Sequence, residues 1–215
     1  MFAEGKTEEG WADWLGDTYR GLQVAITCEG EAGVPATLLQ KAKQKRDDLR
    51  RAGRNTHAAH DEVWIVFDRD EHPFVAETLQ GAIEAGVGVV FSDACFELWP
   101  MMHVEDFTRH THRHALQRRL HELHPPYDHA RGAEVRWPKL PPSFPTAFNR
   151  AIHLHQRGID AGDPFGNPST TAWLLHHRCA KAPEAETLLL DVPEPLRPLL
   201  PDKVAQPLRA RLRSS

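Results

Sequence analysis

Two aspartates separated by one residue are the strongest chemical signal in the sequence. Asp68 and Asp70 follow residues 62–67, a continuous apolar run typical of a strand buried on both faces of a parallel sheet. Acids at positions i and i+2 of an extended chain project the same way, about 6–7 Å apart at the Cα level. Such oxygen ligands suit Mg²⁺ or Mn²⁺, which activate water for phosphodiester cleavage. The alternative is an acidic turn that caps the next helix.

Every predicted strand ends in an acid: Glu4 in residues 2–4, Glu29 after 22–28, Asp68 with Asp70 after 62–67, and Asp93 after 87–91. Ligands of open parallel sheets bind beyond the carboxyl ends of the strands. The acids are therefore expected to converge on one site. Glu29 is expected only beside the site, because Cys28-Glu29-Gly30 lacks the Lys-Thr-Glu continuation that follows Glu4-Gly5.

The segment Glu4-Gly5-Lys6-Thr7-Glu8 predicts a strand-to-helix turn. Gly5 permits a tight turn that leaves Glu4 exposed at the strand end, and Lys6 is placed at the helix start to meet a phosphate. The alternative is a plain helix-opening turn. A nucleotide-binding P-loop is excluded, because that motif requires an upstream strand and a longer glycine-rich loop.

Glu97 is a further candidate acid, within Phe96-Glu97-Leu98-Trp99. One acid among large apolar residues suggests a further metal ligand, or a group that orients Lys6 or a water molecule. The alternative is a solvated acid on a helix surface. His103, one turn after Trp99, could share this face, although a structural histidine is the favoured interpretation.

Late in the chain, Asn167-Pro168-Ser169-Thr170 predicts an ordinary helix start. In a functional alternative, the hydroxyls of Ser169 and Thr170 and the helix amides hold a phosphate beside the acidic site.

Six histidines lie between residues 110 and 129: His110, His112, His114, His121, His124 and His129. Two pairs have helical same-face spacing, but a zinc site needs further ligands. A surface helix is the favoured interpretation. Contact with RNA or DNA that depends on pH is the alternative.

The order of predicted elements indicates an α/β fold with an open, mostly parallel sheet. Helices are expected near residues 8–19, 35–52 and 73–85, between the four strands, which is the pattern of right-handed crossovers. Further helices are expected near 96–107, 112–123, 144–157 and 168–181. We expect an α/β core at 1–95, a helical region packed on it at 96–182, and a loosely ordered Pro/Arg-rich tail at 183–215. The charged face of 35–52 is interpreted as solvated, with phosphate contact as the alternative.

Composition limits the classes of function. The 215 residues carry a net charge of −4 and are 40% hydrophobic, which excludes a generally basic nucleic-acid coat but not a local basic patch. Three distant cysteines favour a reducing cytoplasm over a disulfide framework. We expect a cytoplasmic protein without membrane contact, because the start lacks the apolar run of a signal peptide and no stretch reaches about 18 apolar residues.

Four motifs in order resemble the RloB-like proteins, which are found beside restriction and phage-defence genes. They are EGKTE at 4–8, FDRDE at 67–71, FELW at 96–99 and NPST at 167–170, and the likeness covers about residues 1–181. The N-terminal part of that family resembles a Toprim fold. The resemblance implies that Glu4 is the Toprim glutamate and that Asp68 and Asp70 are its DxD pair.

The implied activity is Mg²⁺- or Mn²⁺-dependent nuclease action on RNA or DNA in an anti-phage or abortive-infection system. Glu4 would act as base or metal orienter, Asp68 and Asp70 as metal ligands and Glu97 as support, while Lys6 would steady the scissile phosphate. One alternative is a non-catalytic subunit that partners an ATPase of the same defence locus. Another is a domain acting on a nucleotide or small phosphorylated ligand.

Two departures from the family pattern bear on these alternatives. Only three residues precede Glu4, where the family has a full first strand, which favours the interaction subunit. A Tyr-x-Lys pattern of the family reads Tyr127-Asp128-His129 here, which puts a lysine role at that point in doubt.

Overall fold

A four-stranded sheet organises the fold. The computed structural model describes residues 1–30, 33–52, 61–69, 72–132, 135–140, 144–181, 192–202 and 204. The strands are β1 (Phe2–Ala3), β2 (Trp64–Asp68), β3 (Gly88–Asp93) and β4 (Ser169–Thr170), in that order across the sheet. β1, β2 and β3 are parallel, and β4 is antiparallel to β3. The expected α/β fold with an open, mostly parallel sheet is confirmed.

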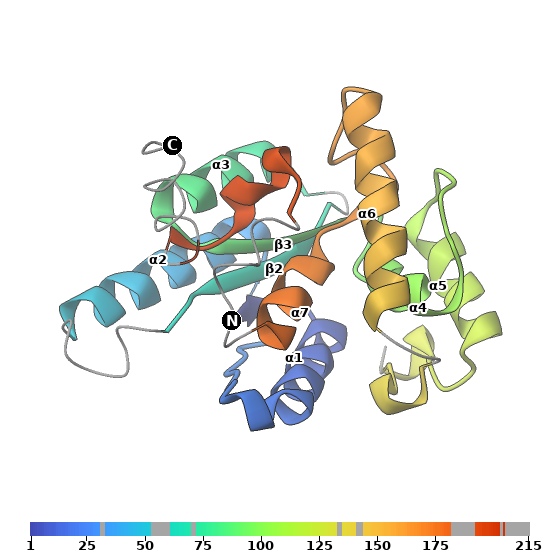
Figure 1. The fold of residues 1–215 in the computed structure, drawn as a ribbon, viewed down its shortest axis with the longest axis horizontal. Coiled ribbons are helices and arrows are strands. Elements are labelled where there is room, and N and C mark those ends of the chain that lie inside the picture. The colour runs from blue at the N-terminus through green and yellow to red at the C-terminus, as the bar shows by residue number, and fades with distance from the viewer. Residues whose placement is uncertain are drawn as a thin grey trace.

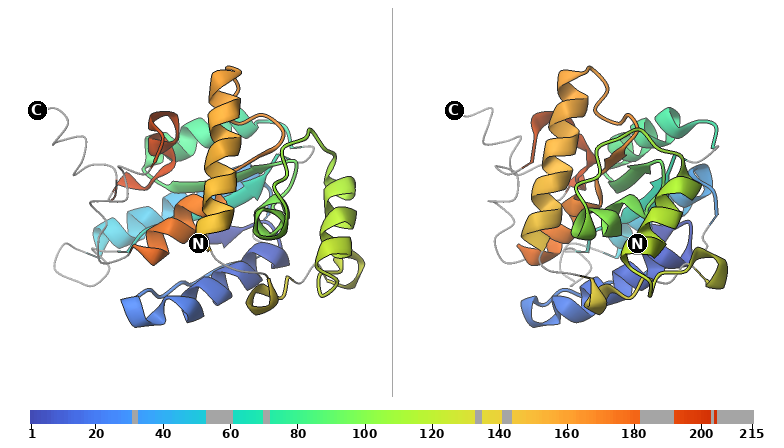
Figure 2. Two further views of the ribbon diagram at one scale, coloured as in Figure 1. Left: turned by 45° about the vertical axis from the view of Figure 1, so that its right-hand side comes forward. Right: turned by 90° about the vertical axis from the view of Figure 1, so that its right-hand side faces the viewer.

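Helices cover both faces and one end of this sheet (Figure 1). They are α1 (Lys6–Thr18), α2 (Pro35–Arg51), α3 (Val75–Ala85), α4 (Leu98–Val104), α5 (Arg113–Leu123), α6 (Phe144–Asp160) and α7 (Ala172–Ala180). α2 and α3 pack together on one face, against β2 and β3. α1 and α7 lie on the other face, where the Tyr19 hydroxyl and His176 Nε2 are 2.8 Å apart. α4, α5 and α6 gather beside the sheet, with α6 standing across its end (Figure 2).

The central strands form where the sequence is continuously apolar. Trp64, Ile65, Val66 and Phe67 are all buried in β2, and every residue of β3 is buried. Because both faces are covered by helices, no alternation of polar residues is needed. The register places Asp68 opposite Ser92, so the acid at the end of β2 lies beside the end of β3.

The strand expected at residues 22–28 is not present. The chain first forms a 3-10 helix at Arg20–Leu22, and Gln23 has a left-handed φ of 60°. Only Glu29 makes a parallel bridge, to Phe2. Because β1 has only two residues, residues 22–28 cannot pair with it over a longer stretch. Val24 and Ile26 instead pack on the core without strand pairing.

The helix start expected at Asn167-Pro168-Ser169-Thr170 is also wrong. Ser169 and Thr170 form β4, and α7 begins two residues later at Ala172. Hydroxyl groups join the strand to its neighbour: Ser92 Oγ lies 2.8 Å from Thr170 Oγ1, and the Phe91 amide donates to Thr171 Oγ1 at 2.8 Å. The polar residues that suggested a helix cap stabilise a strand instead.

Part of the expected loose tail is folded. A 3-10 helix spans Glu194–Leu199, and Leu196 and Leu199 are buried in the core. The Asp202 amide donates to the Gly86 carbonyl at 3.3 Å, and Arg50 lies 3.7 Å from the Asp202 carboxylate. Outside the described residues lie the other parts of this tail, at 183–191, 203 and 205–215.

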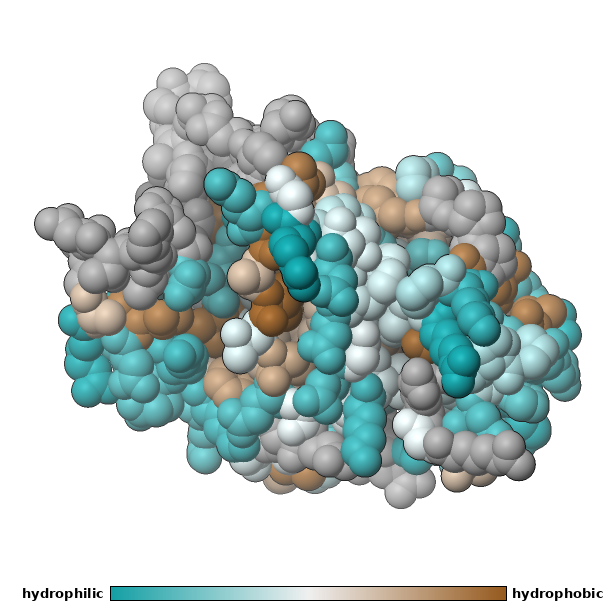
Figure 3. Space-filling view, turned by 90° about the horizontal axis from the view of Figure 1, so that it is seen from below, coloured by the Kyte–Doolittle hydropathy of each residue, from teal (hydrophilic) through white to brown (hydrophobic). Residues whose placement is uncertain are grey.

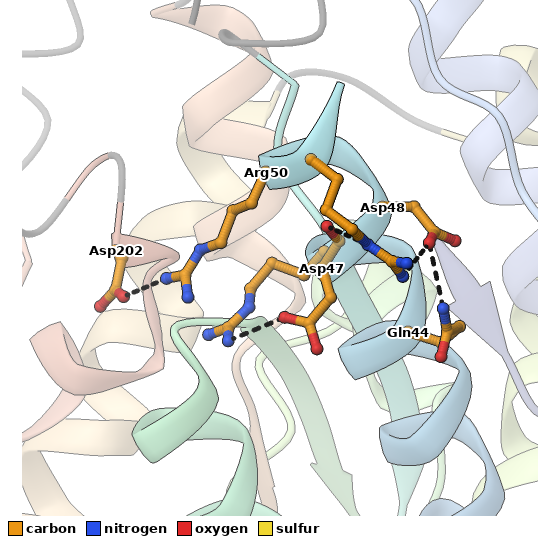
Figure 4. A network of polar contacts seen from close by, with 7 residues as sticks. Gln44, Asp47, Asp48, Arg50 and Asp202 are labelled. Atoms are coloured by element: carbon orange, nitrogen blue, oxygen red, sulfur yellow. Dashed lines mark hydrogen bonds and ion pairs between the residues drawn. The ribbon is translucent and has the colours of Figure 1, made fainter. Parts of the chain in front are cut away.

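The charged face of α2 is occupied by its own ion pairs (Figure 4). Asp48 accepts from Gln44 at 3.0 Å and from Arg51 at 2.6 Å, and Asp47 lies 3.3 Å from Arg46. The Gln44–Asp48 and Asp48–Arg51 contacts, four and three residues apart, are typical of a solvated helix face. The observation favours the solvated interpretation of this run over phosphate contact.

The underside of the molecule, as oriented in Figure 1, is mostly hydrophilic, with hydrophobic residues in small patches (Figure 3). The outward residues of α1 include the exposed Asp13 and Asp17. Among the described residues, no helix is long and apolar enough to cross a membrane.

Gly86 provides a test of how the tail is anchored. Gly86 ends α3 with φ 65°, and an added Cβ would lie 2.1 Å from Asp202 Oδ2. We expect Gly86→Ala to lower the free energy of unfolding by about 1–3 kcal/mol, through backbone strain and displacement of the tail. Gly10→Ala is the control, because nothing lies within 4 Å of its Cβ position in α1; it should stabilise by about 0.5–1 kcal/mol. Urea unfolding of both variants measures this, and equal effects would contradict the anchor.

Candidate functional site

Glu4 joins the ends of the first two strands. It follows β1 directly, and its Oε2 accepts a hydrogen bond from the Asp68 amide at 3.0 Å. Its Oε1 lies 2.9 Å from His72 Nε2. His72 comes from the turn that follows β2, so one carboxylate connects β1, β2 and that turn. Glu4 was expected to be exposed, but only 15% of its side-chain surface is accessible.

Asp68 extends this connection to the third strand. It is the last residue of β2, and its Oδ2 accepts from the Phe96 amide at 3.3 Å. The structure thus brings Glu4 and Asp68 together, as their places at strand ends predict. Asp70, the other half of the expected pair, lies outside the described residues. Lys6 is exposed at the first position of α1.

Glu8 is a buried acid that the sequence interpretation did not select. It is only 5% exposed, and its carboxylate lies against Gly5, where an added Cβ would be 3.0 Å from Oε2. Burial raises the pKa of Glu8 well above its usual value, and the nearby carboxylates of Glu97, Asp68 and Glu4 raise it further. The spacing of four residues between Glu4 and Glu8 was the available signal. These four acids are named here the acidic cluster.

Glu97 is held in its ionised form by surrounding donors. Its side chain is 6% exposed, the Tyr127 hydroxyl donates to Oε1 at 2.7 Å, and His129 Nδ1 lies 3.8 Å from the same oxygen. Burial alone would raise the pKa of Glu97, but hydrogen bonds from His129, Tyr127 and Cys95 outweigh it, so the pKa is lowered. The solvated-acid alternative is therefore wrong, and Glu97 lies inside the cluster.

Tyr127 and His129 are thus site residues that the sequence interpretation missed as such. Hydrogen bonding to Glu97 raises the pKa of His129, which favours an imidazolium beside the carboxylate. The Tyr127-Asp128-His129 segment, noted in the sequence as a departure from the Tyr-x-Lys pattern, supplied the signal. A histidine in this place supplies a cation whose charge depends on pH.

A second polar network lies at the end of β3. Asp93 Oδ2 accepts from Arg69 Nε at 2.5 Å, and its Oδ1 accepts from Asn167 Nδ2 at 2.8 Å. Asn167 Oδ1 in turn accepts from the Thr111 amide at 2.9 Å. The middle residue of the Asp-Arg-Asp motif and the asparagine of Asn167–Thr170 therefore fix the strand end next to the acidic cluster.

The remaining candidates lie elsewhere. Ser169 and Thr170, expected to hold a phosphate, are 2% and 0% exposed within β4. Glu29 forms an ion pair with Lys41 of α2. α5 is the expected surface helix: His114 and His121 are exposed on it, whereas His124, just beyond its end, is buried.

The donor set of the acidic cluster matches a hard divalent cation. Within the described ranges, no three His, Cys, Asp or Glu side chains are already grouped to hold a metal ion. Burial raises the pKa of Glu8, and the carboxylates of Glu97, Asp68 and Glu4 raise it further, so a cation bound beside them would offset their repulsion. Carboxylate oxygens are the ligands that Mg²⁺ and Mn²⁺ prefer. Glu4 and Asp68 are the described residues best placed to hold such an ion.

Glu8→Gln tests the crowding of charge. Because the pKa of Glu8 is raised in the folded protein, folding is favoured below the usual pKa of 4.5 and loses this contribution as pH rises through the folded pKa. We expect Glu8→Gln to raise the Tm at neutral and mildly alkaline pH, in the absence of divalent ions, and to change it little at acidic pH. Scanning calorimetry across pH measures this. Glu9→Gln, one residue along α1, is the control, and an equal gain in both variants would contradict the assignment.

Comparison with known proteins identifies the family of the chain. The family model described as RloB-like protein matches residues 1–177. No curated protein and no solved structure shows a significant match. The matched region contains β1 to β4, the acidic cluster and the Asp93 network, and it covers most of the 215 residues. The chain therefore belongs to the RloB-like protein family.

Proposed function

We propose that the protein is a nuclease that hydrolyses phosphodiester bonds of RNA or DNA with the help of Mg²⁺ or Mn²⁺. The observation that carries this proposal is the acidic cluster at the carboxyl ends of β1 and β2, in which Glu4 contacts the Asp68 amide at 3.0 Å and burial, together with the neighbouring carboxylates, raises the pKa of Glu8. Open parallel sheets place their chemistry at this edge.

Two of the four acids, Glu8 and Glu97, differ in their ionisation, and the other two are the proposed metal ligands. Glu4 and Asp68 would hold the metal ion, together with Asp70 if that residue reaches the same edge. When bound, the ion supplies an activated water and stabilises the departing oxygen. Glu8, with its raised pKa, is suited to hold a proton that it can donate, while Glu97, with its lowered pKa, stays ionised. Such a separation is typical of acid–base pairs.

Cations around the cluster would orient the nucleic-acid backbone. Lys6 is exposed at the first turn of α1, where the helix N-terminus favours a phosphate. His129 fixes Glu97 and is 47% exposed, so it can also reach solvent on the substrate side. The overall charge of −4 favours local contact over a broad basic surface.

Family membership supports a role in anti-phage defence or abortive infection, with a Toprim-like core acting in the cytoplasm. An ATPase of the same locus is the proposed partner protein. Under this proposal the ATPase controls when the nuclease acts.

Asp68→Asn tests the proposed chemistry directly. We expect wild-type protein to cleave at least one member of a panel of tRNA, single-stranded RNA, plasmid and linear DNA in Mg²⁺ or Mn²⁺. The variant should lose more than about a hundredfold of this activity, because weakening residues around a metal site already costs about 10–100-fold. Gel assays with and without EDTA measure cleavage.

Glu29→Gln is the matched control for this test. It also removes a carboxylate beside a strand end, but one that pairs with Lys41 outside the cluster, so cleavage should be unchanged. If the wild type cleaves nothing, even with the ATPase present, the nuclease proposal fails. A subunit that only binds its partner then becomes the better explanation.

His129 gives a pH prediction. Its pKa is raised by the Glu97 carboxylate 3.8 Å away, so the imidazolium is present below that pKa and lost as pH rises through it. We expect activity to fall on the alkaline side, and His129→Lys to extend activity to higher pH because the lysine stays protonated. His129→Ala should be impaired at all pH values. Identical pH profiles for wild type and His129→Lys would contradict the role.

A further inference from the structure

An aromatic pocket opens beside the C-terminal half of α1, away from the acidic cluster. Its volume is about 220 Å³, and its lining residues are Trp14, Thr18, Tyr19, His103, Trp137, Leu140, Phe144 and His176. The rings of Trp14 and Trp137 stack with centroids 5.5 Å apart and an interplanar angle of 22°. The pocket is smaller than the roughly 300–1,000 Å³ of sites for drug-sized ligands, so it fits one flat ring system.

The polar groups in the walls of the pocket carry no charge. Burial lowers the pKa of His103 to about 4, and burial lowers that of His176 as well, so both rings are neutral at neutral pH. His176 Nε2 is 2.8 Å from the Tyr19 hydroxyl. Within the part of the chain that the structure describes, His103 Nε2 and His176 Nδ1 have no hydrogen-bond partner. Buried polar atoms of this kind are costly unless something satisfies them.

We propose that this pocket binds a nucleobase. Flat aromatic rings suit the π-face of a base, and neutral imidazole and hydroxyl groups suit its uncharged donor and acceptor edge. A phosphate or a carboxylate would find no lining cation among the described residues. A ring shift of His103 or His176 would turn an unpartnered nitrogen toward the base.

The position of the pocket relates it to the acidic cluster, and this step rests on the proposed function. The ring of Trp137, which lines the pocket, has its centroid 6.4 Å from that of Phe96, and the Phe96 amide donates to Asp68 of the acidic cluster at 3.3 Å. A strand with one base in the pocket would therefore place a neighbouring phosphate near the cluster. The pocket would then select single-stranded or unpaired nucleotides, since a paired base cannot enter it.

Binding measured in EDTA tests the pocket without any cleavage. The probes are adenosine, uridine, a short single-stranded oligonucleotide and the same backbone with abasic sites, each titrated by calorimetry. We expect at least one nucleoside to bind and the oligonucleotide to bind more tightly than its abasic form. Trp14→Ala should weaken both by about ten- to hundredfold, while Trp14→Phe keeps most of the affinity. If a nucleoside binds but the oligonucleotide binds no more tightly than its abasic form, the ligand of the pocket is a free nucleotide.

Two controls keep the result decisive. Phe74→Ala removes an aromatic ring that is 66% exposed and outside the pocket, so it should change nothing. If Trp14→Ala fails to fold by circular dichroism, Thr18→Trp fills the pocket from an exposed position and should abolish binding. Absence of nucleoside binding in the folded wild type, or equal affinity in Thr18→Trp, would overturn the proposal. Asp68→Asn should retain base binding, so a failed nuclease and a failed pocket give different results.

Discussion

The contact between the Glu4 carboxylate and the Asp68 amide is the interaction on which the site depends. A backbone amide at the end of β2 would otherwise need another partner, and Glu4 provides it from β1 at 3.0 Å. This hydrogen bond fixes the relative positions of two strand ends. The second oxygen of Glu4 remains directed at His72, 2.9 Å away. A carboxylate with this double task is both a structural clamp and the centre of the charge cluster.

Charge crowding at this edge opposes folding, and the surrounding groups show how it is tolerated. Glu97 has three donors and stays ionised, whereas Glu8 has the cluster of carboxylates around it and holds its proton more tightly. The protein therefore keeps two buried acids close together, one with a raised pKa and one with a lowered pKa. Stored unfavourable charge of this kind is typical of functional sites, which sacrifice some stability for chemistry.

Local sequence patterns were sufficient to predict the elements whose own residues determine their conformation. The apolar run at β2, Pro35 at the start of α2 and Gly86 at the end of α3 each determine local conformation. Residues 22–28 have similar strand propensity, but a strand needs a partner of matching length, and β1 offers two residues. Ser169 and Thr170 show the reverse case, because pairing with Ser92 and Asp93 overrides a helix-start pattern.

The same reasoning explains which site residues were predictable. Glu4 and Asp68 end adjacent strands, so topology alone brings them together. His129 reaches Glu97 from a separate 3-10 turn, and Asn167 reaches Asp93 across 74 residues of sequence. Rules based on neighbouring residues cannot predict contacts between residues so far apart in the sequence. Both contacts nevertheless fall in segments singled out in the sequence for other reasons, so the motifs identified these positions but not their partners. The architecture is consistent with this division: Glu4 and Asp68 lie at the ends of parallel strands, and the region beyond β3 provides Glu97 together with Tyr127 and His129, which favour its ionised form.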